Sequence, residues 1–231
     1  MPAWLERAAP SELGVFLGKT ASPRKSGLFI RHLCRCFPEV FVDPRSLAAL
    51  DAADRYEAGE IGHNGFEAAR RAAEEALLHA RAEYNPMAPD PLADATRTAR
   101  TALLGAGLAH DVVTQGYFRT LLADLRGVVL DRAGAGGGPR KNPIAPVMRP
   151  VFLEHFGDPR RPVARDPSWL TETVLALAQG IYVERAFDRL PILADALEDA
   201  GCDNADVLGH CRGPGPHVRG CWVIDLLLGK E

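Results

Sequence analysis

The sequence predicts an all-α protein, an irregular multi-helix bundle that ends in a C-terminal helical hairpin. Three observations favour this fold class. Helix starts with a capping residue followed by proline recur along the chain, long stretches are rich in strong helix formers, and no stretch alternates apolar and polar residues with the period of a strand. With 231 residues, the chain is long enough for one large domain or for two lobes.

The N-terminal lobe is predicted over residues 1–132. The Ser-Pro pair at 22–23 opens a helix through SPRKSGLFIRHLCRCF, and the Asp-Pro pair at 43–44 opens the next one, which Gly59 ends. The third helix, FEAARRAAEEALLHARAEY, has a mostly alanine apolar face, which indicates close packing or a place at the edge of the core. Two further helical stretches, LADATRTARTALLGAG and HDVVTQGYFRTLLADLRGVVLDR, complete the lobe.

A segment rich in glycine and proline, residues 133–145, is predicted to be a flexible linker. Its AGAGGGPRKNP run does not fit a phosphate-binding P-loop, because that motif needs Ser or Thr directly after its lysine and here Asn142 follows Lys141. The linker separates the N-terminal lobe from a C-terminal lobe at 146–231, with a single continuous domain as the alternative.

The C-terminal lobe is predicted to begin with a short helix, PVMRPVFLEHF, and an ordered loop, GDPRRPVARDP. A long helix through SWLTETVLALAQGIYVERAF follows, and another is expected through DRLPILADALEDAG, with Asp188 as its N-cap and Gly201 as its stop. The last two helices, CDNADVLGHCR and HVRGCWVIDLLLG, flank a Gly-Pro-Gly-Pro turn. We expect them to pack antiparallel as a hairpin, with Trp222 anchored in the core.

Composition and charge argue against several classes of function. A net charge of −3 gives no general attraction to nucleic acids or anionic membranes. No segment approaches the roughly 18 apolar residues of a membrane span, and Glu6, Arg7 and Glu12 interrupt the apolar run that a signal peptide needs. We therefore expect a cytoplasmic location, where the odd count of five cysteines favours reduced thiols over disulfides.

The two ends of the chain resemble a family of uncharacterised bacterial proteins. The resemblance is carried by WLERAAPSELGVFLGKTASPRKSGLFIRHLCRCF and, more specifically, by DPSWLTETVLALAQGIYVERAFDRLPILADALEDAGCDNADVLGHCRGPGPHVRGCWVIDLLLGKE. It implies a shared architecture. It implies no activity, because the family has none established, so function has to be inferred from the residues themselves.

The chemically most unusual segment is HCRGPGPHVRGCW, residues 210–222. A helix that starts near Pro216 would place His217 and Cys221, four residues apart, on one face, where both can reach one ion. The preceding helix and turn supply two more ligands, and four N and S ligands form the closed shell of a structural zinc site. The four candidate ligands are Cys202, His210, His217 and Cys221. Alternates for them are Cys211 and the pair His32 and Cys36.

A competing interpretation treats this segment as a tight turn between packed helices. The spacing lacks the Cys-x(2–4)-Cys knuckle of zinc fingers, and a small buried hydrophobe is the commonest fate of a cytosolic cysteine. The histidines then cap helix ends, and a chelator leaves the melting temperature unchanged. The sequence favours this interpretation, so no cofactor is predicted and zinc is the alternative.

Neither C-terminal thiol suits nucleophilic catalysis. Cys211 is predicted near a helix C-terminus, where the helix dipole disfavours a thiolate, and Cys221 in an apolar helix, where burial raises the pKa of a thiol. The favoured function is therefore a non-enzymatic module that acts through contacts with a protein partner. The first rival is a zinc-binding protein. The second is a nucleic-acid-associated protein that uses Arg160, Arg161 and Arg165.

Overall fold

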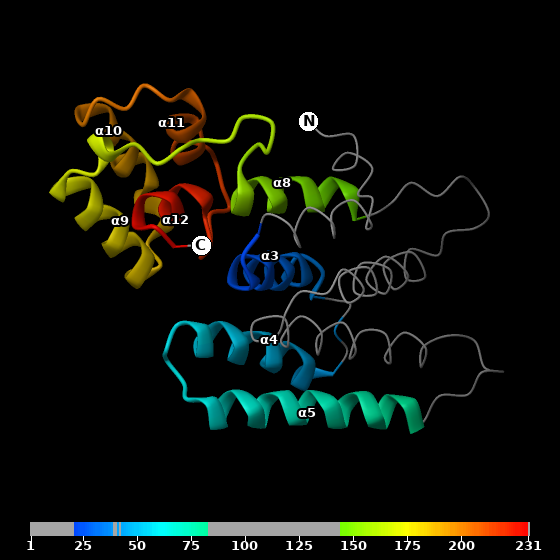
Figure 1. Ribbon diagram of the computed structural model, residues 1–231. Helices are drawn as coiled ribbons and strands as arrows, with labels where there is room; N and C mark the ends of the chain where they lie inside the picture. The colour runs from blue at the N-terminus through cyan, green and yellow to red at the C-terminus, as the bar shows by residue number, and fades with distance from the viewer. Residues whose placement is uncertain (1–20, 39–40, 42, 83–143, 231) are drawn as a thin grey trace, which may run out of the picture. The chain divides into compact units, whose positions relative to one another are not determined.

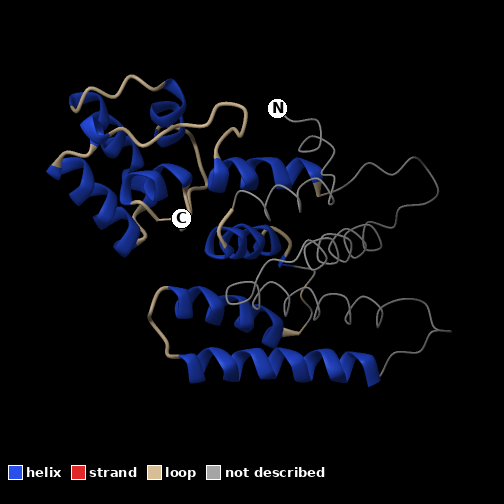
Figure 2. Cartoon of the chain, in the orientation of Figure 1, coloured by secondary structure: helices blue, strands red, loops and turns tan. Residues whose placement is uncertain are grey.

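The computed structural model describes residues 21–38, 41, 43–82 and 144–230 (Figure 1). These residues form eight α-helices and two short 3-10 helices and contain no strand, which confirms the all-α fold class (Figure 2). None of the described helices has the length and apolar character needed to cross a membrane. The two helices expected between residues 92 and 132 lie outside the described residues, as does nearly all of the linker expected at 133–145.

The chain divides into two compact units, Met1–Val151 and Phe152–Glu231. The boundary between the units falls inside helix α8 (Ala145–Phe156), which contains Pro150. The short helix that the sequence predicts in this region is therefore present, and it is the segment through which the chain passes from one unit to the other.

Three helices of the N-terminal unit are described: α3 (Pro23–Arg35), α4 (Pro44–Glu57) and α5 (His63–Ala82). The predicted starts of α3 and α4 are confirmed. Ser22 Oγ accepts a hydrogen bond from the Lys25 N–H over 3.1 Å, and Asp43 accepts one from the Arg45 N–H over 2.9 Å. The proline that opens each helix has no N–H that would need a partner there.

Small side chains allow α4 and α5 to pack closely on each other. Ala49, Ala53 and Ala73 are buried around Phe66, so the alanine face of α5 lies in the core rather than at its edge. Gly59, with φ +74°, follows the end of α4 as predicted, because the turn there needs a left-handed backbone.

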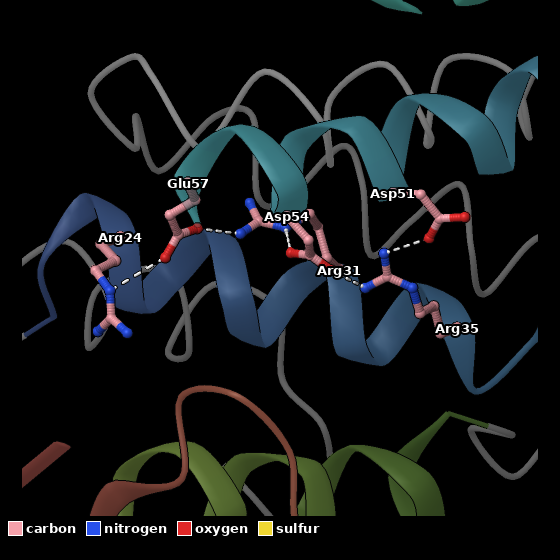
Figure 3. Close-up of polar contacts among 6 residues, drawn as sticks. All are labelled: Arg24, Arg31, Arg35, Asp51, Asp54 and Glu57. Atoms are coloured by element: carbon pink, nitrogen blue, oxygen red, sulfur yellow. Dashed lines mark hydrogen bonds and ion pairs between the residues drawn. The ribbon is translucent and has the colours of Figure 1, made fainter. Parts of the chain in front are cut away.

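Helices α3 and α4 carry opposite charges toward each other (Figure 3). Six residues form this charge ladder: Arg24 pairs with Glu57, Arg31 with Asp54 and Glu57, and Arg35 with Asp51 and Asp54. The acidic residues are three apart on α4, which places them on one helical face. Arg31 is fully buried, and its Nε and Nη2 atoms pair with two carboxylates in place of water, whereas its Nη1 atom has no hydrogen-bond partner among the described residues.

The C-terminal unit contains the end of α8 and the helices α9 (Glu172–Glu184), α10 (Leu190–Asp199), α11 (Ala205–Cys211) and α12 (Trp222–Leu228). Helix α10 packs against α9 and α11, and α12 packs mainly against α9. Their inner faces form one apolar core, which includes Val174, Leu193, Val207 and Ile224 together with Trp169, which precedes α9.

The long helix expected from residue 168 to 187 is shorter than predicted. Its first residues form the 3-10 helix η2 (Pro167–Trp169), and α9 begins only at Glu172. The reason is a capping interaction that the sequence pattern conceals: Thr171 Oγ1 accepts a hydrogen bond from the Val174 N–H over 3.3 Å.

The prediction that Asp188 is the N-cap of the next helix is wrong. Asp188 lies within the 3-10 helix η3 (Phe187–Arg189), and α10 starts at Leu190 with Pro191 in its first turn. Proline is well accommodated in that turn because the N–H groups there have no partner within the helix. Gly201, with φ +86°, follows the end of α10 as predicted.

The last helix also starts later than predicted. Residues 213–221 form a non-helical loop and α12 begins at Trp222, so the expected helix start near Pro216 is wrong. Gly215 (φ +70°) and Gly220 (φ +90°) give the loop left-handed turns that a helix does not contain. Helices α11 and α12 are in contact, but α11 packs mainly on α10 and α12 on α9, so no separate C-terminal hairpin stands out from the helix cluster.

Candidate metal centre

Four side chains of the C-terminal unit bring potential metal ligands together. They are Glu154 of α8, His210 of α11, His217 of the 213–221 loop and Cys221, the residue that precedes α12. One ligand atom from each side chain lies within 4.8 Å of all the others. The four residues come from three separate parts of the chain, α8, α11 and the 213–221 loop, so the tertiary fold, and not a local sequence motif, assembles the group.

Three of the distances among these atoms are close to those in a tetrahedral metal shell. His210 Nε2 lies 3.1 Å from Cys221 Sγ and 3.5 Å from Glu154 Oε2, and His217 Nδ1 lies 2.9 Å from the same Glu154 oxygen. Zinc–ligand bonds of about 2.0–2.3 Å place tetrahedral ligand atoms about 3.3–3.8 Å apart. A small outward movement of the side chains would therefore accommodate an ion.

Contacts outside the group orient the ligands. The His217 ring has its Nε2 atom 3.4 Å from the Gly213 carbonyl oxygen, and donation to that oxygen leaves Nδ1 free to bind an ion. Glu154 Oε1 accepts a hydrogen bond from the Val218 N–H over 3.1 Å, which turns Oε2 toward the two histidines. These contacts are of the type that holds metal ligands in place in known sites.

The group lies in a largely water-excluded setting. Glu154 and Cys221 are buried, and the side chains of His210 and His217 are only 15% and 10% exposed. Trp222, which the sequence predicts to anchor the core, is only partly buried. Its ring packs against the apolar core and also edge-on against the His210 ring, with the ring centroids 5.4 Å apart. This indole therefore backs one of the ligands.

Burial and neighbouring charges set the protonation of the group. Burial, with a further contribution from His217, lowers the pKa of His210 to about 3, so that imidazole is neutral. The hydrogen bond to Glu154 raises the pKa of His217, and burial raises the pKa of the Cys221 thiol well above its usual value. Cys221 is therefore not a reactive thiolate, whereas a bound cation would remove its proton outright.

Three of the four sequence-predicted ligands lie together in this group, namely His210, His217 and Cys221. Cys202 does not join them: it is buried in the apolar core just after α10. Cys211 also lies in that core, as expected from the different direction of adjacent helical side chains. Both thiols have a raised pKa because of burial.

The sequence alone did not indicate Glu154 as a ligand. Its position far upstream of the histidines gives no spacing signal, and the only local sign is the Glu-His pair in an otherwise apolar helix end. The alternates His32 and Cys36 belong to no such group of three or more ligands among the described residues. Cys36 is exposed at the end of α3, and burial lowers the pKa of His32 to about 4.

The arginines proposed for nucleic-acid binding have partners within the C-terminal unit. Arg160 and Arg161 both pair with Asp158, and Arg161 also pairs with Asp206. Arg165 donates a hydrogen bond to the Leu227 carbonyl over 2.9 Å. The three arginines of this loop therefore have contacts within the protein that can account for their presence.

Comparison with known proteins adds no identification: no family model, curated protein or solved structure matches the chain. The resemblance of the two ends of the chain to a bacterial family stays a prediction.

Proposed function

We propose that the C-terminal unit binds one zinc ion through Glu154, His210, His217 and Cys221, and that the ion has a structural role. The observation that carries this proposal is the convergence of four ligand atoms within 4.8 Å from α8, α11 and the 213–221 loop, on two buried and two partly buried side chains. The proposal reverses the preference for packed thiols that the sequence supports, because Glu154 lies beside the two histidines and Cys221 in the place expected for Cys202.

The chemistry of the donor set favours zinc. Imidazole nitrogen, thiolate sulfur and carboxylate oxygen are the ligands that this ion takes in proteins. The ionised carboxylate and the thiolate together carry two negative charges, which balance the charge of a divalent ion. A neutral cluster is the form in which such charges are best tolerated away from water. Four protein ligands leave no open position for a substrate, so the proposed ion stabilises structure.

The 213–221 loop is the segment that such an ion would stabilise most. The loop contains no helix and is rich in glycine and proline, yet His217 lies within it and Cys221 ends it. An ion would connect this loop to α8 and α11 at once. Metal sites built in this way contribute their binding free energy to folding.

The test is elemental analysis of the full-length chain, followed by titration of the metal-free protein with zinc. We expect one zinc per chain, and loss of at least about 90% of the bound metal in His217→Ala or Cys221→Ser. Cys202→Ser is the matched control: it also replaces a buried thiol but should retain the ion. Cobalt(II) in place of zinc should give a thiolate charge-transfer band that Cys221→Ser removes. Metal-free protein that binds neither ion would refute the proposal.

The wider role expected from the sequence, a non-enzymatic module that contacts a protein partner in the cytoplasm, stays a prediction. A structural ion is compatible with that role, because it fixes the shape of a surface without taking part in chemistry.

A further inference from the structure

Helix α8 combines three features that bear on how the metal centre acts. It crosses the boundary between the two units, it contains Pro150 just before that boundary, and it carries the ligand Glu154 just after it. Pro150 has no N–H to donate to the carbonyl four residues earlier, so the helix lacks one of its hydrogen bonds there. The helix therefore lacks a backbone hydrogen bond next to the boundary between the two units.

Beyond Pro150, the last turn of α8 is held by contacts to the 213–221 loop and to Trp222. Glu154 contacts His217 and the Val218 N–H, and the His155 Nδ1 atom lies 3.2 Å from the Gly220 carbonyl oxygen. Gly157, which ends the helix with φ +65°, lies so near Trp222 that a Cβ atom would be 3.3 Å from the indole. The site and its surroundings thus supply the polar anchors of this turn.

From these contacts, and resting on the proposed zinc site, we infer that the metal ion acts as a latch on α8: its binding fixes the turn after Pro150 more firmly to the 213–221 loop and α11, and its removal leaves that turn to the direct contacts alone. Pro150 is the hinge of the latch. Occupancy of the site then regulates the order of the segment that joins the two units in sequence.

Hydrogen exchange measured by mass spectrometry on the full-length chain tests the latch. The zinc-loaded protein and the chelator-treated protein are compared, with metal content determined on the same samples. We expect amides 153–157 to exchange at least about tenfold more slowly with zinc, because opening of this turn then requires release of a ligand. Amides of α4, which lies in the other unit, should change less than about twofold.

Two proline variants separate the hinge from the ion. Pro150→Ala restores the missing N–H at an exposed position, so the metal-free turn should already be protected and the zinc effect should fall below about threefold. Pro146→Ala is the matched control. It is also exposed but lies in the first turn of α8, where its N–H has no partner, so the zinc effect should remain tenfold.

The outcomes distinguish the latch from the proposed function. If zinc binds and amides 153–157 exchange at the same rate with and without it, the latch is wrong and the zinc site stands. If Pro150→Ala keeps the full zinc effect, the hinge is wrong. If the metal-free chain binds no zinc in the titration, the proposed function fails, and the latch fails with it.

Discussion

The two units of the molecule bury polar side chains in opposite ways. The charge ladder of the N-terminal unit contains its own cations, because three arginines of α3 face three carboxylates of α4. The candidate metal centre gathers a carboxylate, two imidazoles and a thiol around one point, and Glu154 contacts two histidines and a backbone N–H. The ladder pairs charges of both signs within the chain, whereas a buried set of lone-pair donors favours a cation from solution.

This difference predicts different responses to perturbation. Substitution of one residue of the charge ladder should lower the stability of the N-terminal unit, and a chelator should leave that stability unchanged. The metal centre should respond to chelators and should be unaffected by changes in the ladder.

The largest effect is expected from Arg31→Met in the charge ladder. The substitution keeps much of the side-chain volume but leaves Asp54 and Glu57 without the buried guanidinium that pairs with both. Breaking a buried pair by removal of one partner costs about 3–5 kcal/mol. The loss in the free energy of unfolding is measured by urea unfolding, followed by circular dichroism. Hydrogen exchange in α3 and α4 shows where in the chain the stability is lost.

Arg35→Met is the control for that substitution. Arg35 lies on the same helix and pairs with Asp51 and Asp54, but it is 34% exposed, and exposed pairs contribute about 1 kcal/mol or less. Equal losses in the two variants would show that the ladder behaves as an ordinary surface network and that burial of Arg31 has no special importance.

The charge ladder shows which features the sequence predicts and which it does not. The helices were predictable because Ser22 and Asp43 are followed by proline, a local signal that depends on neighbouring residues only. The pairing of α3 with α4 was not, because helix periodicity places Arg31 on a face of its helix but does not reveal which helix lies opposite. Its burial became evident only from the three-dimensional contacts.

The candidate metal centre shows the same limit. The histidines and Cys221 were identified from their unusual density in one segment, although the helix expected to align them is a loop. Glu154 could not be predicted as a candidate ligand, because it lies far from the histidines in the sequence and only the fold brings it close to them. Local composition indicated the segment, and the tertiary structure brings Glu154, and not Cys202, beside the other three candidate ligands.

Removal of metal should give the second largest effect, in the C-terminal unit. With free zinc about 100-fold above its dissociation constant, binding contributes about 3 kcal/mol, which corresponds to a shift of more than about 10 °C in the melting temperature of a unit of this size. Trp169 and Trp222 lie in this unit, so their fluorescence in a Trp4→Phe background reports its unfolding. As a control, Arg31→Met should show the same chelator-dependent shift in melting temperature as the wild type. If a chelator leaves the melting temperature of the wild type unchanged, the proposed difference between the two units is wrong.

The smallest effect concerns acid, and it sharpens the description of the N-terminal unit. His32 lies on α3 beside the ladder, and burial, reinforced by the positive charge of Arg35 and opposed by Asp54, lowers its pKa to about 4. The unfolded chain has a histidine pKa of about 6.5, so between pH 6.5 and 4 the unfolded state binds more protons than the folded state. Stability is therefore fully present above pH 6.5 and is lost as the pH falls toward 4.

Because His32 is only partly buried, we expect this loss to be about 1–2 kcal/mol between pH 7 and pH 4.5. His210 in the C-terminal unit also has a lowered pKa, so the pH dependence of the whole chain is not specific to His32. The specific measurement is the difference between wild type and His32→Gln, taken from hydrogen exchange in α3 and α4 at the two pH values. In His32→Gln, acid should destabilise these helices less by that amount. An identical acid response in both proteins would mean that His32 is protonated as easily in the folded unit as in the unfolded chain, and that the ladder beside it does not exclude a further positive charge.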